Sequence, residues 1–129
     1  MLPDWPEGTV AVLSTAGPHA IPVSTATRGG DTTVHLALAH RRDSLARLRD
    51  EPRCALTILA AGDHAFTAHG HAVAFEETEH VVAVRIAVDA IADHNRPTYE
   101  IRDGVQWDWT DESERERDAA TRAAMRDLL

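Results

Sequence analysis

The amino-acid sequence predicts a mainly β fold: an antiparallel barrel of about six to seven strands, a short corner helix and an amphipathic C-terminal helix. Short runs rich in β-branched residues alternate with glycine-containing turns, which is the pattern of β-hairpins. Residues 109–129 then change character and consist largely of residues that favour a helix. At 129 residues the chain has the size of one domain, and we expect residues 1–129 to form one.

The first part of the chain contains five β-prone segments: residues 9–15, 19–27, 32–39, 53–60 and 65–77. Three turns separate some of them, namely Ala16-Gly17-Pro18, Arg28-Gly29-Gly30-Asp31 and Ala61-Gly62-Asp63. Because short turns join strands that are neighbours in the sequence, we expect the strands to pair mostly in sequential order, as an antiparallel meander.

Residues 80–95 are compatible with both a helix and a strand. Alanines and the length of the segment permit a helix, whereas its valines and isoleucines favour a strand. The even positions from 82 to 88 are all apolar, which is the period of a strand. We therefore expect a strand here. Residues 98–109 are typical of a further hairpin, with Asp103-Gly104 at its turn.

A short helix is expected at residues 44–50, between two of the strands. Asp43 is a plausible N-cap, Leu45 and Leu48 lie on one face, and Pro52 blocks continuation of the helix. The N-terminus of this corner helix should therefore face the loop that precedes it.

The C-terminal segment 109–129 is expected to form a helix with Thr110 or Asp111 as its N-cap and acidic residues in the first turn. An apolar stripe runs along it, formed by Ala120, Ala123, Ala124, Met125 and Leu128. We expect this stripe to pack against the barrel or to make a dimer contact.

The charge composition limits the partners of this protein. The net charge is −8 with a pI near 5.4, and every basic residue is an arginine. This balance argues against a nucleic-acid surface, which needs clustered basic residues. Apolar runs are shorter than the ~20 residues of a membrane-spanning helix, and the first residues lack a signal-peptide pattern. We expect a protein that binds no membrane and lies in the cytoplasm.

Cys54 is the single cysteine, so an internal disulfide is impossible and a reducing compartment is the natural one. It lies in the apolar segment 53–60. A small buried hydrophobic residue is the favoured interpretation there, rather than a nucleophile.

Arg41 and Arg42 lie between the end of a strand and the start of the corner helix, next to Ser44. Two guanidinium groups, the backbone N–H groups of a helix N-terminus and its positive dipole end are the ingredients of an anion site. The alternative is a solvated arginine pair, because exposed arginines are common.

Other candidate chemistry is weaker. His64, His69 and His71 invite a metal interpretation, but no cysteine or carboxylate completes a ligand set, and we expect no metal site. Gly70 within a strand indicates close approach by a ligand or by backbone. The motifs of serine hydrolases and of nucleotide-binding loops are missing. Trp107 and Trp109 could cover a flat ligand, or belong to a core or interface.

Several stretches together point to a known family. They are "VAVLSTAGPHAIPVS", a Gly-Gly hairpin, "VHLALAHRRDSLARLRDEPRCALTIL" and "HGHAVAF". Within them Leu48, Asp50 and Pro52 match a corner pattern L-x-x-D/N-P, and Gly70-His71-Ala72 matches a G-x-A pattern. From residue 9 to about 76 the chain resembles the FMN-binding split barrels of the pyridoxamine 5′-phosphate oxidase-like superfamily, including its small actinobacterial members that use deazaflavin.

This resemblance implies a split β-barrel that forms a homodimer, with two cofactors at the subunit interface. It implies that the flavin ring is lined by the second strand and that the phosphate is held at the strand-to-helix corner. Arg42 matches a frequent phosphate-binding arginine. Ser44 stands where many members have a lysine, and Arg41 is the residue that can supply the missing charge. The cofactor-binding residues implied are Pro22, Val23, Ser24, Thr25, Leu38, Ala39, His40, Arg41, Arg42 and Ser44.

The resemblance implies an FMN-dependent or deazaflavin-dependent oxidoreductase that acts on a small organic substrate. The flavin carries the redox chemistry in such proteins, so a catalytic acid or base is not required and no catalytic residue is assigned. Two alternatives remain: a non-enzymatic flavin- or haem-binding protein, and a dimeric module with a decayed cofactor site. The serine at position 44 supports the last of these.

Overall fold

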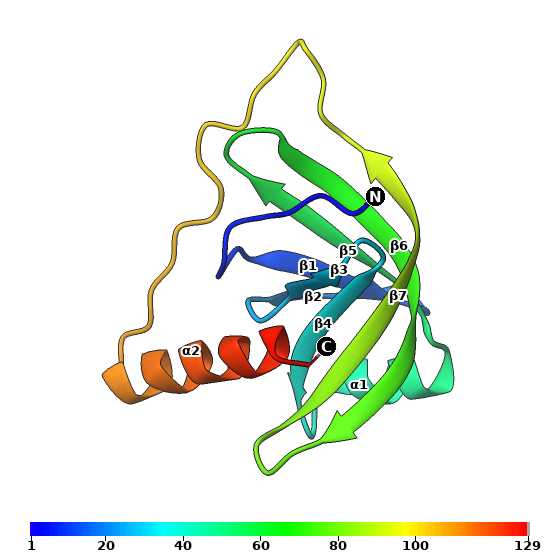
Figure 1. Ribbon diagram of the computed structural model, residues 1–129, viewed down its shortest axis with the longest axis vertical. Coiled ribbons are helices and arrows are strands. Elements are labelled where there is room, and N and C mark those ends of the chain that lie inside the picture. The colour runs from blue at the N-terminus through cyan, green and yellow to red at the C-terminus, as the bar shows by residue number, and fades with distance from the viewer. Residues whose placement is uncertain (129) are drawn as a thin grey trace.

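The computed structural model describes residues 1–128, which form seven strands and two helices (Figure 1). The elements in chain order are β1 Ala11–Thr15, β2 His19–Val23, β3 Thr27–Gly30, β4 Thr33–Ala39, α1 Asp43–Asp50, β5 Arg53–Ala60, β6 His64–Glu77, β7 Val81–Asp93 and α2 Glu112–Arg126. The mainly β class and both expected helices are thus confirmed. No helix in this part of the chain is long and apolar enough to cross a membrane.

All seven strands belong to one antiparallel sheet with the order β2-β1-β5-β6-β7-β4-β3. The expected sequential meander is therefore wrong in two places, because β1 pairs with β5 and β4 pairs with β7. The two longest strands, β6 and β7, pair along most of their length with two register shifts, and such irregularities increase the bending of a sheet. The sheet curves into a barrel whose two edges are β2 and β3.

The barrel is split along part of its length. β3 pairs only with the first residues of β4, so the second half of β4, from Leu36 onward, has no strand on that side. β2 is the opposite edge of the sheet. Thr25, between β2 and β3, is bonded to β4 at the end of the split: its hydroxyl donates to the Ala37 carbonyl and accepts from the Ala37 N–H, both at 3.1 Å. This one side chain makes the two hydrogen bonds that a paired strand would otherwise make with Ala37.

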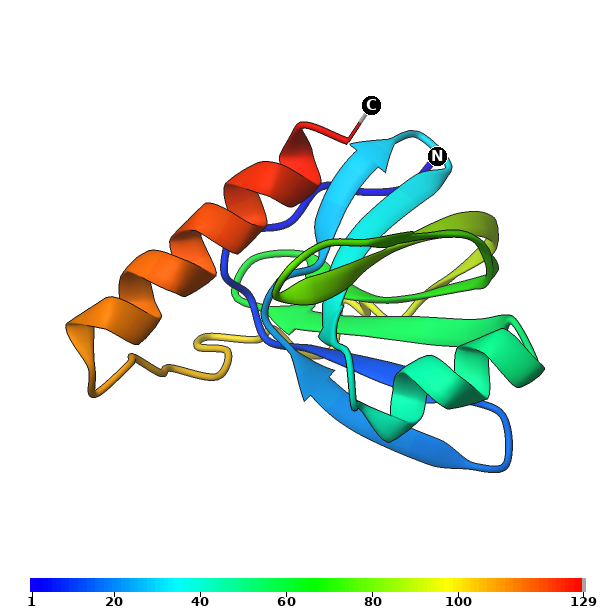
Figure 2. The same ribbon diagram turned by 90° about the horizontal axis from the view of Figure 1, so that it is seen from below.

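The core lies inside the barrel and continues under α1. Phe66 and Ile58 from the β5–β6 hairpin and Leu48 from α1 belong to this one core, and each is at most 1% exposed. Leu45 is also buried, as the one-sided pattern of the corner helix predicts. In Figure 2, α1 lies beside the β1–β2 hairpin and α2 covers the opposite side of the barrel. The corner helix is therefore anchored by its apolar face and presents its N-terminus to the surface.

Two sequence-based boundaries need correction, and one expected strand is confirmed. The expected strand 19–27 is broken at residues 24–26, where the chain leaves one sheet edge for the other. Arg28 to Gly30 lie in β3 rather than in a turn. The expected strand over 80–95 is confirmed as β7.

The expected hairpin over 98–109 is wrong. Residues 94–111, which we call the strap, contain no strand and run along the outside of the barrel from β7 to α2 (Figure 1). The strap passes the end of β5 so closely that a Cβ on Gly104 would lie 3.1 Å from the Leu59 carbonyl oxygen. The Asp103-Gly104 dipeptide is a turn signal, but none of residues 98–109 joins the sheet.

Backbone atoms of a neighbouring strand lie close to Gly70, as a glycine within a strand indicated. A Cβ at this position would lie 2.1 Å from the carbonyl oxygen of Ala87 on β7. This glycine is therefore required by the pairing of β6 with β7 at a register shift.

The two helices begin differently. Asp111 is the N-cap of α2, as expected, and its carboxylate accepts from the Ser113 N–H at 2.9 Å. In α1 the cap position is occupied by Arg42, without a side-chain cap, and Asp43 is the first helical residue rather than the N-cap. The Asp43 carboxylate instead accepts from Arg47 one turn further on, at 3.1 Å.

The apolar stripe expected on α2 packs only in part. Met125 is buried and Ala123 and Leu128 are half-buried, whereas Ala120 and Ala124 are exposed. The polar residue Asp118 is also buried against the barrel, because Arg122 lies 3.2 Å from its Oδ2 and the Ser24 hydroxyl donates to its Oδ1 at 3.2 Å. Ala120 and Ala124 are consequently left on the surface.

Candidate functional site

The N-terminus of α1 offers free backbone donors. The Arg42 N–H donates to Ala39 O at 3.0 Å and the Leu45 N–H donates to Arg42 O at 3.1 Å. Between them, the N–H groups of Asp43 and Ser44 have no acceptor among the described residues. Unpartnered N–H groups at a helix N-terminus favour an anionic ligand.

Arg41 and Arg42 are exposed at this corner. Neither guanidinium group has a carboxylate or other hydrogen-bond partner among residues 1–128. Other arginines of the same region are engaged: Arg47 with Asp43, Arg49 with Glu77 and Arg53 with Glu51. Two adjacent guanidinium groups thus remain available for an anion in a chain whose net charge is −8.

Ser44 is placed differently from a surface anion ligand. It is 1% exposed, and its hydroxyl lies 3.1 Å from His19 Nε2 at the start of β2. The side chain therefore fastens α1 to the edge strand, and it does not take the place of the lysine that many relatives carry. Only its backbone N–H faces the corner.

The three residues that lead into the corner have separate environments. Leu38 is 2% exposed and belongs to the core. Ala39 is exposed at the end of β4, and His40 is exposed with its Nε2 at 2.8 Å from the Thr78 carbonyl oxygen. Ala39 and His40 are thus surface neighbours of the corner, whereas Leu38 supports it from inside.

The segment expected to line a flavin ring lies at the other end of β2. Thr25 is bound to Ala37 across the split, and the Ser24 hydroxyl is bound to Asp118. Pro22, Val23 and Ser24 form one wall of a groove of about 170 Å³, which is lined by Val10, Pro22, Val23, Ser24, Trp107 and Trp109. Of the four residues expected to line the ring, Pro22, Val23 and Ser24 therefore border a surface hollow, whereas Thr25 does not.

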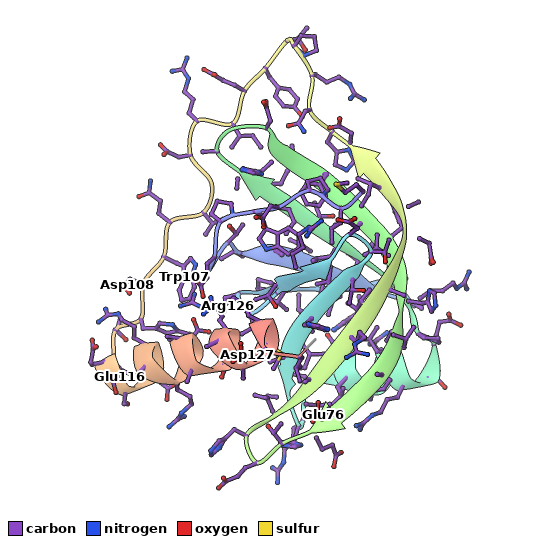
Figure 3. The ribbon with its side chains drawn as sticks, viewed as in Figure 1. Glu76, Trp107, Asp108, Glu116, Arg126 and Asp127 are labelled. Atoms are coloured by element: carbon purple, nitrogen blue, oxygen red, sulfur yellow. The ribbon has the colours of Figure 1, made fainter. Side chains whose placement is uncertain are left out.

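Trp107 and Trp109 complete this groove, which we call the tryptophan groove. Their rings meet edge to face with centroids 5.3 Å apart, and the Trp107 indole N–H donates to Gly8 O at 3.1 Å. Figure 3 shows Trp107 on the strap, near the N-terminal end of α2. The sequence indicated that this pair could cover a flat ligand, but not that it would lie against Pro22.

Two side-chain hydrogen bonds connect the β2 region with α1 and β4. Thr25 contacts Ala37 at one end, and His19 contacts Ser44 at the other. Along β2, the four residue steps from His19 to Val23 span about 13 Å. The anion corner and the tryptophan groove therefore lie at the two ends of one edge strand.

Cys54 does not provide a nucleophile. Burial raises the pKa of its thiol to about 11, and the nearby Asp89 carboxylate adds to this effect. Low-pKa, exposed thiolates are the reactive ones, so this cysteine is a packing residue.

The histidines are dispersed over the sheet. His71 Nδ1 lies 3.0 Å from Asp89 Oδ2, while His64 and His69 are elsewhere on β6. Within residues 1–128, no three histidine, cysteine, aspartate or glutamate side chains gather in a way that could hold a metal ion.

No family model and no curated protein matches the sequence. Solved structures do match the fold. An NADH:FAD oxidoreductase of Streptomyces globisporus, in complex with NAD and FAD fragments, is 14% identical with a TM-score of 0.60, covering 76% of this chain and 79% of its own. A protein of the pyridoxamine 5′-phosphate oxidase type from Listeria innocua is 18% identical with a TM-score of 0.56, covering 68% of this chain and 90% of its own.

An F420 reductase is 9% identical with a TM-score of 0.58, covering 68% of this chain and 92% of its own. At these identities the comparisons concern the fold. The chain thus has the split-barrel fold of flavin reductases and pyridoxamine 5′-phosphate oxidase-like proteins, the superfamily that its sequence resembles.

Proposed function

We propose that this protein binds FMN, or alternatively a deazaflavin, along the edge strand β2 and acts as an oxidoreductase on a small organic substrate. The observation that supports the proposal is that hydrogen bonds connect the surroundings of the two segments that the resemblance assigns to the cofactor, 22–25 and 38–44. Thr25 is bonded to Ala37, which precedes the second segment, and Ser44 is bonded to His19, which begins the strand that leads to the first segment.

The residues at the corner fit a phosphate. Arg41 and Arg42 supply charge, and the N–H groups of Asp43 and Ser44 supply donors that lack a partner among the described residues. Charge-assisted contacts of this kind are the strong ones for a phosphate. The Asp43 carboxylate opposes an anion at a helix N-terminus, but its pairing with Arg47 reduces that repulsion.

The chemistry would come from the cofactor: when bound, a flavin supplies the hydride or electron transfer. The chain's own residues bind the phosphate, orient the ring at the tryptophan groove and keep water from one of its faces. No acid or base of the protein is assigned to the reaction.

A second candidate, a dimeric module with a decayed cofactor site, is favoured by position 44. The serine hydroxyl is bound to His19, and an acidic residue stands beside it in the first helical turn. Both features weaken a phosphate site compared with a lysine.

Purified protein and titration distinguish these functions. We expect a flavin spectrum in the purified protein, or saturable binding of added FMN or deazaflavin measured by cofactor fluorescence. A haem band in the visible spectrum would support the haem-binding alternative. A colourless protein that binds neither FMN nor deazaflavin would support the decayed module and refute the proposed function.

We further propose that the protein is a homodimer, formed through the outer face of strands β2, β1 and β5. Val12 pairs with Pro22 on one side and with Thr57 on the other, and alternation places all three on the outer face. Val12 and Leu59 are 37% and 49% exposed. The residues of this outer patch are Val12, Ser14, Ala20, Pro22, Ala55, Thr57 and Leu59, and none is charged.

A further inference from the structure

We propose that Trp107 and Trp109 are cofactor-ring contacts, and that the Trp109 indole N–H donates a hydrogen bond to an acceptor on the ring. This inference rests on the proposed function, and it adds residues from the strap, outside the part of the chain that carries the family resemblance. The ligand class is a planar heteroaromatic ring with carbonyl or ring-nitrogen acceptors, as in a flavin or deazaflavin.

The walls of the tryptophan groove suit a flat ring. Val10, Pro22 and Val23 give an apolar wall from the barrel, and the two indoles give the other from the strap. Apolar and aromatic walls with few polar groups are typical of sites for planar ligands. A ring lying over this groove would contact these walls with one side and would stack or pack edge-on against the indoles.

One polar group of the tryptophan pair lacks a partner. The Trp109 indole nitrogen is buried, and no acceptor for its N–H exists among the described residues. The other two indoles are satisfied: Trp107 donates to Gly8 O and Trp5 donates to Ala26 O. Buried indole N–H groups usually find a partner, so the Trp109 N–H is a donor that a ligand acceptor in the adjoining groove would satisfy.

The strap is held in place without any ligand. Arg115 of α2 donates two hydrogen bonds to the Asp108 carboxylate, from Nη2 to Oδ2 at 2.9 Å and from Nε to Oδ1 at 3.2 Å. It also donates to the Trp109 carbonyl oxygen at 3.3 Å. Asp108 lies between Trp107 and Trp109 in the sequence, so these hydrogen bonds hold the backbone next to both tryptophans. The indoles are thus positioned before a ring arrives, which lowers the ordering cost of binding.

The groove is smaller than a complete ligand site. Its volume of about 170 Å³ compares with roughly 300–1,000 Å³ for typical small-molecule pockets. It therefore accounts for one side of a ring, and the opposite side is left for the substrate or for a second copy of the chain.

Indole resonances test this inference directly. The chain has three tryptophans, so ¹H–¹⁵N spectra contain three indole N–H signals, which single Trp→Phe variants assign. We expect saturating riboflavin to move the Trp109 signal downfield and to shift the Trp107 signal, while the Trp5 signal stays in place. Trp5 is the matched control because it is 8% exposed, in the core, and already has an acceptor.

Affinity provides the second readout. Trp109→Phe should weaken riboflavin and FMN alike by about tenfold, the value of one hydrogen bond, while Trp5→Phe should leave both affinities unchanged. Riboflavin that binds with an unmoved Trp109 signal would overturn this inference and leave the proposed function standing. Wild-type protein that binds no flavin or deazaflavin would overturn both. If Trp109→Phe does not fold, the wild-type signal alone decides.

Discussion

Arg42 and Arg49 stand at opposite ends of α1 and provide a matched pair for testing the phosphate corner. Arg42 has no partner among the described residues, whereas Arg49 binds Glu77 at 3.3 Å and lies over the Phe75 ring. We expect Arg42→Ala to weaken FMN binding about ten- to a hundredfold, because a charge-assisted contact contributes about 1.5–3 kcal/mol. Arg49→Ala should not change the affinity. Titration followed by flavin fluorescence measures both.

Riboflavin, which lacks the phosphate, separates a phosphate contact from damage to the barrel. Wild type and Arg42→Ala should bind it equally well, and the thermal midpoint without cofactor should barely change, because Arg42 is exposed. Equal FMN affinity in wild type and Arg42→Ala would mean that the corner is a solvated loop.

The buried thiol of Cys54 should make the free energy of unfolding fall at alkaline pH. The pKa of its thiol is raised from 9.0 to about 11 in the folded protein. Between these values the unfolded chain loses the thiol proton while the folded protein keeps it, so unfolding becomes easier as the pH rises. The chain has no lysine and one tyrosine, so few other side chains titrate in this range.

We expect the free energy of unfolding to fall by about 2 kcal/mol across this window, and Cys54→Ala to remove most of the fall. Urea unfolding at several pH values gives the measurement. A wild type and a Cys54→Ala variant with the same alkaline slope would contradict the burial argument.

At the scale of elements, the docking of α2 depends on His35. This residue of β4 is 2% exposed, its Nδ1 lies 3.1 Å from the Met125 carbonyl oxygen of α2, and Arg85 Nε donates to its Nε2 at 3.3 Å. Burial lowers the pKa of His35; the Met125 contact opposes this shift, and the Arg85 charge adds to it. The neutral imidazole, with its proton on Nδ1, satisfies both contacts.

Because the folded pKa of His35 lies below its ordinary value of 6.5, the stabilisation is complete above pH 6.5 and is lost as the pH falls through the lowered pKa. We expect α2 to undock more easily in mild acid, which hydrogen exchange of the α2 amides at pH 7.5 and 5.5 would detect. His35→Gln should reduce the pH dependence. Identical α2 exchange at both pH values, after correction for the intrinsic rate, would contradict this role.

For the whole molecule, two surfaces are candidates for the dimer interface. One is the outer patch around Val12 and Leu59, and the other is the exposed part of α2 that contains Ala120 and Ala124. We expect Val12→Glu to dissociate a dimer, because it places a charge within a closed apolar contact. Ala124→Glu, at a position equally exposed in the single chain, is the control and should leave the dimer intact.

Sedimentation of the wild type and both variants at micromolar concentration decides between these surfaces. A wild-type monomer would refute the dimer, and dissociation by Ala124→Glu alone would assign the interface to α2.

The sequence by itself determined much of the local structure. β-branched runs and glycine-containing turns identified most strands, Leu45 and Leu48 identified the buried face of α1, and Asp111 identified the start of α2. These features depend on contacts within a few residues, which a single chain segment specifies. The family resemblance added which segments belong to the cofactor, but not their arrangement in this chain.

Only the tertiary structure decided the strand order and the site geometry. The pairing of β1 with β5, and the bonds from Ser44 to His19 and from Asp118 to Ser24, join residues 25 to 94 positions apart. Local pattern carries no information about such partners. The apolar stripe expected on α2 was right for Met125 but did not include the buried Asp118, because a buried carboxylate is acceptable only once Arg122 and Ser24 neutralise and hold it.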